Sequence, residues 1–144
     1  MSTQQIFGLV LTDMSRTLGE ISKRVVTVSP DVASSTNLGG WINRVGVWKT
    51  GDSEDLPGED VVRALRWEES KDGQHIELGI SENNLFMMLG QLGLPYERDG
   101  EMLFPIGTVY DPFVRRGLDA FVYSVYSGAK FIVVGTPSGL SLAP

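Results

Sequence analysis

The sequence predicts an α/β fold in which a mostly parallel sheet has helices on both faces. Short apolar runs that suit strands alternate with amphipathic helical patterns, in the order strand, helix, strand, helix, strand. The last run, residues 131–134, is apolar throughout, which is typical of strands in parallel sheets. Such an alternation implies parallel strands joined by right-handed crossovers.

The composition fits one soluble domain spanning residues 1–144. The hydrophobic fraction is 42% and the charged fraction is 21%, both ordinary for globular proteins. No apolar run approaches the ~20 residues of a membrane span, and the first residues do not resemble a signal peptide. The chain has no cysteine, which excludes disulfides, thiolate metal sites and cysteine nucleophiles. We therefore expect a cytoplasmic location and no membrane partner.

The charge and the histidine content narrow the possible chemistry. A net charge of −6 argues against nucleic acid as a partner, because phosphate binding needs clustered Lys and Arg. A single histidine excludes zinc sites built on several histidines. The chemistry must then come from carboxylates, tyrosine, hydroxyls, backbone amides or a cofactor, and we assign no metal ligands.

The first two elements are predicted from periodicity and from turn residues. Residues 2–23 form a helix with one apolar stripe, capped by Ser2 or Thr3. Residues 25–28 are a β-branched run that ends at Ser29-Pro30 and predicts a buried strand. Asp31 follows directly, so it lies at the carboxyl end of that strand, where Ser-Pro-Asp also suits a simple turn.

Residues 32–72 show no clean periodicity and are predicted to be a long irregular segment within the domain. Acidic residues between positions 52 and 60 surround Pro57-Gly58 without a nearby base, which indicates a solvated loop. A connection of this length in a compact domain is often functional or faces a partner.

The stretch 74–84 is predicted to be a short strand that passes through Gly79 into the first turn of a helix. That helix has an apolar stripe and ends at Gly93 and Pro95. Glu82 lies at the junction, at the carboxyl end of a strand, where parallel sheets bind ligands. An alternative remains open on spacing alone: Glu82 merely complements the helix dipole, with Ser81 as the cap.

The remaining elements continue the alternation. Residues 102–107 are predicted to be a strand, weakened by Pro105. A helix follows Pro112, with the inward stripe Val114, Leu118, Phe121, Val122 and Val125. No helix follows the strand at 131–134, so we expect the chain to be a fragment of a longer one.

Four polar segments follow predicted strands and should share one edge of the sheet. They are Asp31, residues 81–83, Tyr110-Asp111 and residues 136–138. His75 is expected to be a strand residue with a satisfied ring rather than a ligand, and Arg115-Arg116 to be a solvated face. Neither GxGxxG nor GxxxxGK[ST] occurs, so no phosphate loop is predicted.

Several motifs resemble a known family. The run GQHIELGISENNLF at 73–86 is similar to the GQH-[IL]-ELGIAEMNLF motif of homodimeric pyruvate dehydrogenase decarboxylating components. The segments PIGTVYDPF at 105–113 and RGLDA at 116–120 match the family's PIGT-[VL]-YDPF-x-x-RGLDA. The segments TPSG at 136–139 and LAP at 142–144 resemble the family's TPSGVTLAP, and VSPD at 28–31 and STNLG at 35–39 fit one subgroup of it. The resemblance covers nearly the whole chain.

The resemblance implies a pyrimidine-binding domain of a transketolase-like thiamine diphosphate enzyme. Glu82 matches the glutamate that hydrogen-bonds the aminopyrimidine ring and activates the cofactor. Ile80 matches an apolar residue that supports the bent cofactor, and Phe113 matches an aromatic residue near the pyrimidine. Tyr110 and Asp31 match residues that face the substrate. Arg116 matches a family arginine to which we assign no role.

The resemblance also implies partners outside this chain. The diphosphate and its Mg²⁺ are held by a separate domain with a GDG…N motif, which does not occur here. The expected parent is a homodimer that decarboxylates pyruvate and passes the acyl unit to a lipoyl acyltransferase component, so this chain alone should be inactive. Ser81 and Asn83 replace the usual Ala and Met around the glutamate.

Two other hypotheses remain open on the sequence. One is a non-catalytic, flavodoxin-like ligand or subunit-interaction module. The other is another transketolase-type enzyme that acts on a different 2-oxo acid or on a ketose.

Overall fold

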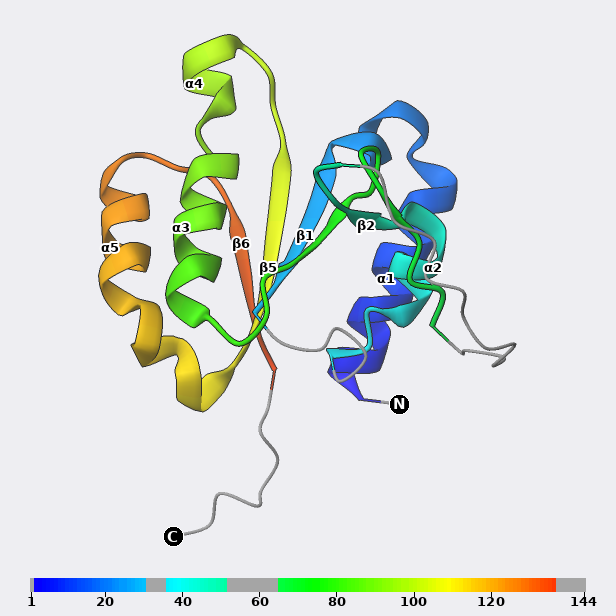
Figure 1. The fold of residues 1–144 in the computed structure, drawn as a ribbon, viewed down its shortest axis with the longest axis horizontal. Helices are drawn as coiled ribbons and strands as arrows, with labels where there is room; N and C mark the ends of the chain where they lie inside the picture. The colour runs from blue at the N-terminus through cyan, green and yellow to red at the C-terminus, as the bar shows by residue number, and fades with distance from the viewer. Residues whose placement is uncertain (1, 31–35, 52–64, 137–144) are drawn as a thin grey trace, which may run out of the picture.

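The protein forms a six-stranded sheet in which every pair of neighbours is parallel (Figure 1). The computed structural model describes residues 2–30, 36–51 and 65–136. The strand order is β3-β2-β4-β1-β5-β6. The strands are β1 (Val25–Ser29), β2 (Val47–Trp48), β3 (Glu69–Ser70), β4 (His75–Glu77), β5 (Phe104–Tyr110) and β6 (Ile132–Thr136). The predicted α/β class with a parallel sheet is confirmed.

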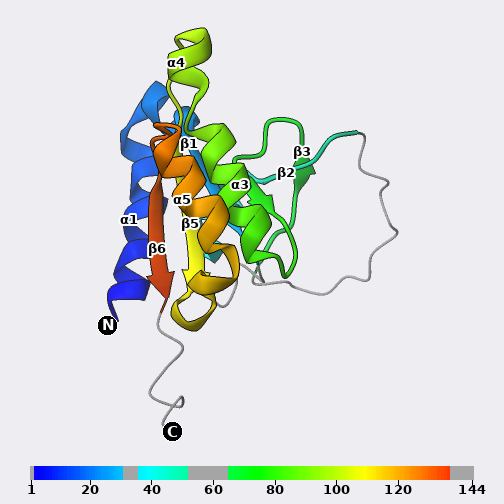
Figure 2. The same cartoon turned by 90° about the vertical axis from the view of Figure 1, so that its left-hand side faces the viewer.

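Helices cover both faces of the sheet (Figures 1 and 2). One face carries α1 (Thr3–Thr17) and α2 (Gly39–Val45), and the 3-10 helix η1 (Gly19–Arg24) follows α1. The other face carries α3 (Glu82–Leu92) and α5 (Leu118–Tyr126). The short α4 (Pro95–Asp99) and the 3-10 helix η3 (Asp111–Gly117) complete the described elements. This layering is consistent with a transketolase-like pyrimidine-binding domain.

The sheet has one hydrophobic core on each face, because successive side chains of a strand point to opposite faces. Val25 of β1 and Ile106 of β5 pack with α1 and α2, whereas Val28 and Val109, three residues further on, pack under α3. Helix α3 fills the second core with fully buried apolar side chains, namely Leu85, Phe86 and Leu89. Helix α3 is therefore fixed against β1 and β5, and its first residue has a defined position over the edge of the sheet.

The N-terminal helix is shorter than predicted. Its start is as expected, because Ser2 and Gln5 form a capping box. The α-helix ends at Thr17, and the chain continues to Arg24 as a 3-10 helix. Gly19 has a φ of +52°, a left-handed conformation that breaks the α-helical path and that glycine adopts without strain.

The segment 32–72 is not irregular throughout, so that prediction is wrong for its described parts. It contains α2 and the strands β2 and β3. Each of these strands has only two residues, which is too short for a period of two to show in the sequence. Asp31 and the acidic stretch 52–60 lie outside the described residues.

The second half of the chain differs from the prediction in register and in exposure. Strand β5 begins and ends later than predicted, and buried Pro105 is accommodated because the pairing with β6 starts only at Ile106. Strand β6 is the edge of the sheet and not an interior strand, and Ile132 is 55% exposed.

The predicted inward stripe of the following helix is wrong for three of its members. Leu118, Val122 and Val125 of α5 are exposed, whereas Phe121 packs in the core. Ser124 of α5 faces Gly90 of α3 and donates a hydrogen bond to the Phe86 carbonyl at 3.1 Å. The small residues at this crossing let the two helices approach closely, so the face of α5 that meets α3 contains Ser124 and not the three exposed apolar residues.

No helix in the described ranges is both long and apolar enough to cross a lipid bilayer.

Candidate functional site

The topology brings the carboxyl ends of β4, β1 and β5 together. Strand β1 lies between β4 and β5, and α3 carries the chain from β4 across β1 to β5. The chain thus changes direction across the sheet at β1, and in open α/β sheets ligands bind at the carboxyl ends of strands at such a switch point. Glu82 begins α3 immediately after this edge.

The loop between β4 and α3, residues 78–81, is anchored at both of its ends. The Leu78 amide donates to the Ser29 carbonyl at 3.0 Å, and the Ser81 amide donates to the Pro30 carbonyl at 3.3 Å. Between them Gly79 has a φ of +69°, where a side chain would be strained. The loop therefore places Ile80 at its apex, where this apolar side chain is 77% exposed.

Glu82 is a buried carboxylate paired with an arginine. The residue is only 7% exposed, although it occupies the first turn of a helix. Arg116 Nη1 donates to Glu82 Oε1 at 3.3 Å. Ser81 occupies the N-cap position, as the helix-dipole alternative expected, but its side chain makes no capping hydrogen bond among the described residues. A first-turn acid that only complements a helix dipole has no need of burial, so the burial of Glu82 calls for a specific partner.

The 3-10 geometry of η3 stacks the side chains that lie next to Glu82 in space. A 3-10 helix has three residues per turn, so side chains at i and i+3 eclipse each other. Accordingly the Arg116 guanidinium lies over the Phe113 ring, 3.9 Å from its centroid. Tyr110, three residues earlier, meets Phe113 edge to face with ring centroids 6.2 Å apart. Tyr110, the last residue of β5, and Phe113 of η3 are thus joined to the Glu82 carboxylate through Arg116.

Gly117 allows η3 to come this close. A Cβ at this position would lie 2.6 Å from the Glu82 carbonyl oxygen and 2.4 Å from Phe86 Cδ2. Real Cβ atoms essentially never approach so closely. The glycine therefore permits the direct contact between the end of η3 and the start of α3 that brings Arg116 to Glu82.

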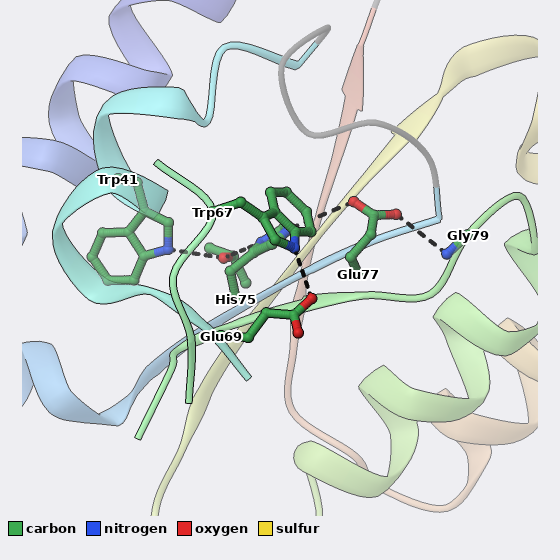
Figure 3. A network of polar contacts seen from close by, with 7 residues as sticks. Trp41, Trp67, Glu69, His75, Glu77 and Gly79 are labelled. Atoms are coloured by element: carbon green, nitrogen blue, oxygen red, sulfur yellow. Dashed lines mark hydrogen bonds and ion pairs between the residues drawn. The ribbon is translucent and has the colours of Figure 1, made fainter. Parts of the chain in front are cut away.

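A second polar cluster lies beside the site on β4 (Figure 3). His75 is fully buried, and its Nδ1 is 2.9 Å from Thr27 Oγ1. The Trp41 indole donates to the same Thr27 oxygen at 2.8 Å. Among the described residues, His75 Nε2 has no hydrogen-bond partner, and it lies 3.6 Å from Glu77 Oε2. The expectation of a strand histidine is confirmed, but the ring is satisfied on only one side.

The structure places the predicted site residues as follows. Glu82, Phe113 and Tyr110 form one contiguous group through Arg116, and Ile80 is two residues away from Glu82 in the anchored loop. Thr136 is buried and donates to the Val109 carbonyl at 3.3 Å. Asp31 and residues 137–138 lie outside the described residues.

Sequence reasoning missed the contact of Arg116. It expected Arg115-Arg116 to be a solvated face; both arginines are exposed as expected, but Arg116 also pairs with Glu82. The signal was present as the spacing Tyr110-x-x-Phe113-x-x-Arg116, which has the period of a 3-10 helix rather than that of an α-helix.

Comparison with known proteins finds a partial relative. A pyruvate dehydrogenase E1 component from Cupriavidus necator is 26% identical to this chain over 113 residues. The match covers 78% of this chain and 12% of that protein. No family model matches the sequence. The chain is thus similar, over most of its length, to a small part of a much longer enzyme component.

Proposed function

We propose that this domain binds the aminopyrimidine ring of thiamine diphosphate, with Glu82 as the carboxylate that meets the ring. The observation that carries the proposal is a carboxylate that is 7% exposed, at the carboxyl edge of a parallel sheet, joined through Arg116 to an aromatic ring. The similarity to a pyruvate dehydrogenase E1 component supports it.

The residues present fit such a ring. Arg116 contacts Glu82 Oε1, and within the described ranges no hydrogen bond reaches Oε2, which leaves this oxygen to accept from a ligand. Phe113 contributes an aromatic ring beside this carboxylate, with one face covered by Arg116, and the exposed Ile80 side chain offers an apolar support on the preceding loop. A planar, partly polar heterocycle needs this combination of one polar anchor and apolar contacts.

In this proposal each residue has a separate task. Glu82 binds a proton-bearing nitrogen of the ring and orients it, Ile80 and Phe113 hold the ring in place, and Tyr110 and Asp31 face the substrate. When bound, thiamine diphosphate supplies the electron sink for decarboxylation of a 2-oxo acid. Burial of Glu82 excludes water from the shared proton, which strengthens this contact.

The whole-protein activity belongs to the same proposal. The parent enzyme would decarboxylate pyruvate and transfer the acyl unit to a lipoyl acyltransferase component. The diphosphate and Mg²⁺ would be held by a diphosphate-binding domain of the same or a partner subunit in a homodimer. The 144-residue chain alone would lack decarboxylase activity, because that domain's motif does not occur in it.

The test is an NMR titration of the ¹⁵N-labelled chain with thiamine, which carries the aminopyrimidine without the diphosphate. We expect amide shifts confined to residues 79–83 and 110–117, with millimolar affinity, because a small ligand of this size gains only about 4 kcal/mol. Amide shifts elsewhere on the protein would contradict the proposal. So would the absence of shifts at about 10 mM thiamine, ten times a millimolar dissociation constant.

One observation favours a second candidate, a non-catalytic ligand-binding or subunit-interaction module. Glu82 already has a cationic partner in Arg116, which is sufficient for a purely structural ion pair. If the domain is such a module, the titration with thiamine gives no localised shifts, and replacement of Glu82 changes only the stability of the fold. The thiamine titration and the stability of a Glu82 variant therefore separate the two candidate functions.

A further inference from the structure

The buried cluster around His75 of β4 contains a hydrogen-bond chain from Trp41 of α2 through Thr27 of β1 to His75. The donor and acceptor in each bond can be assigned atom by atom. An indole nitrogen only donates, so Trp41 Nε1 donates to Thr27 Oγ1 and the threonine oxygen accepts. Thr27 and His75 are fully buried and lie opposite each other on neighbouring strands. Water therefore does not compete for the polar atoms between them.

The Thr27 hydroxyl has one proton to donate. Within the described part of the chain, the hydrogen bonds of Thr27 Oγ1 reach Trp41 and His75 only. Trp41 cannot accept, so we assign this proton to His75 Nδ1. The reverse arrangement, with Nδ1–H donating to Thr27, would leave the hydroxyl proton without an acceptor and would turn the Nε2 lone pair toward the Glu77 carboxylate. With Nδ1 as an acceptor, the neutral ring carries its proton on Nε2.

The Nε2 proton faces a carboxylate. Glu77 Oε2 is 3.6 Å from His75 Nε2, just beyond hydrogen-bond distance, and neither buried atom has a hydrogen-bond partner among the described residues. The second oxygen, Glu77 Oε1, accepts from the Gly79 amide at 3.3 Å. Figure 3 shows Trp41, His75, Glu77 and Gly79 following one another in this order. Glu77 is half-buried, but a donor that faces its buried Oε2 atom stabilises this oxygen and restricts the rotation of the carboxylate.

We propose that Trp41, Thr27, His75 and Glu77 form a positioning relay that fixes the backbone at Gly79. The relay connects α2, on one face of the sheet, through β1 and β4 to the loop that precedes Glu82. The Leu78 and Ser81 amides are held by the backbone near the end of β1, so Glu77 supplies the anchor between them. Its role in orienting Ile80 and Glu82 toward a ring rests on the proposed function, whereas the proton positions do not.

The proton positions can be read directly, because His75 is the single histidine of the chain. The ¹⁵N shifts of the imidazole at neutral pH report which nitrogen carries the proton. We expect the neutral ring with the proton on Nε2. A ring protonated on Nδ1, or on both nitrogens, overturns the relay.

A pair of threonine variants tests the direction of the chain. Thr27→Val keeps the branched shape but removes the hydroxyl, so the His75 Nδ1 shift and the Trp41 indole proton shift both move away from their hydrogen-bonded values. Thr27→Ser keeps the hydroxyl and restores both. Unchanged signals in Thr27→Val contradict the relay, and so does a failure of Thr27→Ser to restore them.

A third variant tests the anchor on the loop. Glu77→Gln has one acceptor oxygen instead of two, so this oxygen can face the His75 Nε2 proton or the Gly79 amide, but not both. We expect the Gly79 amide to exchange with solvent about five- to tenfold faster, as for the loss of one hydrogen bond. The Leu78 and Ser81 amides are internal controls and should change less. Equal acceleration at all three positions, or none at Gly79, overturns the anchoring role.

These outcomes are independent of ligand binding. If the imidazole and amide signals behave as expected and thiamine does not bind, the relay stands and the proposed function fails. If thiamine binds at Glu82 while His75 shows the other tautomer, the relay fails and the proposed function stands.

Discussion

Replacing Gly117 by alanine should disturb the contact on which the candidate site depends. The added Cβ would lie 2.6 Å from the Glu82 carbonyl oxygen and 2.4 Å from Phe86 Cδ2. Ordinary contact begins near 3.4 Å, so η3 and the start of α3 must separate by roughly 1 Å. Neither neighbour is a flexible side-chain end, because one is backbone and Phe86 is fully buried.

The expected cost follows from overpacking. Inserting a methyl group into a well-packed contact destabilises a protein by about 1–3 kcal/mol. For a chain of this size that corresponds to a melting temperature lowered by about 3–10 °C. Thermal unfolding followed by circular dichroism measures this, with a urea titration as a second readout.

A matched variant controls for the change from glycine to alanine itself. Gly39, at the start of α2, has a negative φ, and a Cβ there would make only an ordinary contact of 3.7 Å with Leu65. Gly39→Ala should leave stability unchanged or raise it by up to about 1 kcal/mol. Wild-type stability for Gly117→Ala, or equal losses for both variants, would refute the close approach of η3 and α3.

Three further predictions concern named interactions. In a double-mutant cycle, Arg116→Ala and Glu82→Gln should couple by about 1 kcal/mol, measured by urea unfolding at low salt; additive effects would mean that the ion pair contributes nothing. Hydrogen bonding by the Lys49 ammonium lowers the pKa of Glu69 in the folded state. The Lys49–Glu69 pair therefore stabilises the fold fully above the ordinary carboxyl pKa, and this contribution is lost as pH falls through the lowered pKa of Glu69. The stability advantage of wild type over Lys49→Met should therefore shrink as pH falls from about 6 to about 3, and a constant advantage would contradict it. Leu89→Ala should cost about 2–5 kcal/mol by opening a cavity under α3, and a loss below 1 kcal/mol would show that the core collapses around it.

The fold was predictable where the local patterns are long enough. The strand at 25–28, the helix after Glu82 and the carboxyl-edge position of Glu82 all follow from periodicity and turn residues, and the structure contains all three. Strands β2 and β3 were not predictable, since two residues carry no period. The exposure of Ile132 depends on the strand order, which no local pattern contains.

The candidate site was predictable in part. Its central residue, Glu82, follows from the strand-to-helix junction, and the motif resemblance adds Phe113 and Ile80. Arg116 was missed because an α-helical period was assumed where the chain forms a 3-10 helix. The cluster around His75 joins residues far apart in sequence, so only the register of β1 against β4 brings them together.

The central claim is that the Glu82 carboxylate binds an aminopyrimidine ring, and the most direct measurement compares the affinity for thiamine across two variants. Glu82→Gln removes the acceptor charge at the site, whereas Asp119→Asn removes an exposed first-turn acid of α5 and serves as the matched control. Dissociation constants come from NMR titrations of the folded chains. We predict at least about a 10-fold loss for Glu82→Gln, or about 1.4 kcal/mol, and no change for Asp119→Asn. Equal affinity of wild type and Glu82→Gln would contradict the account.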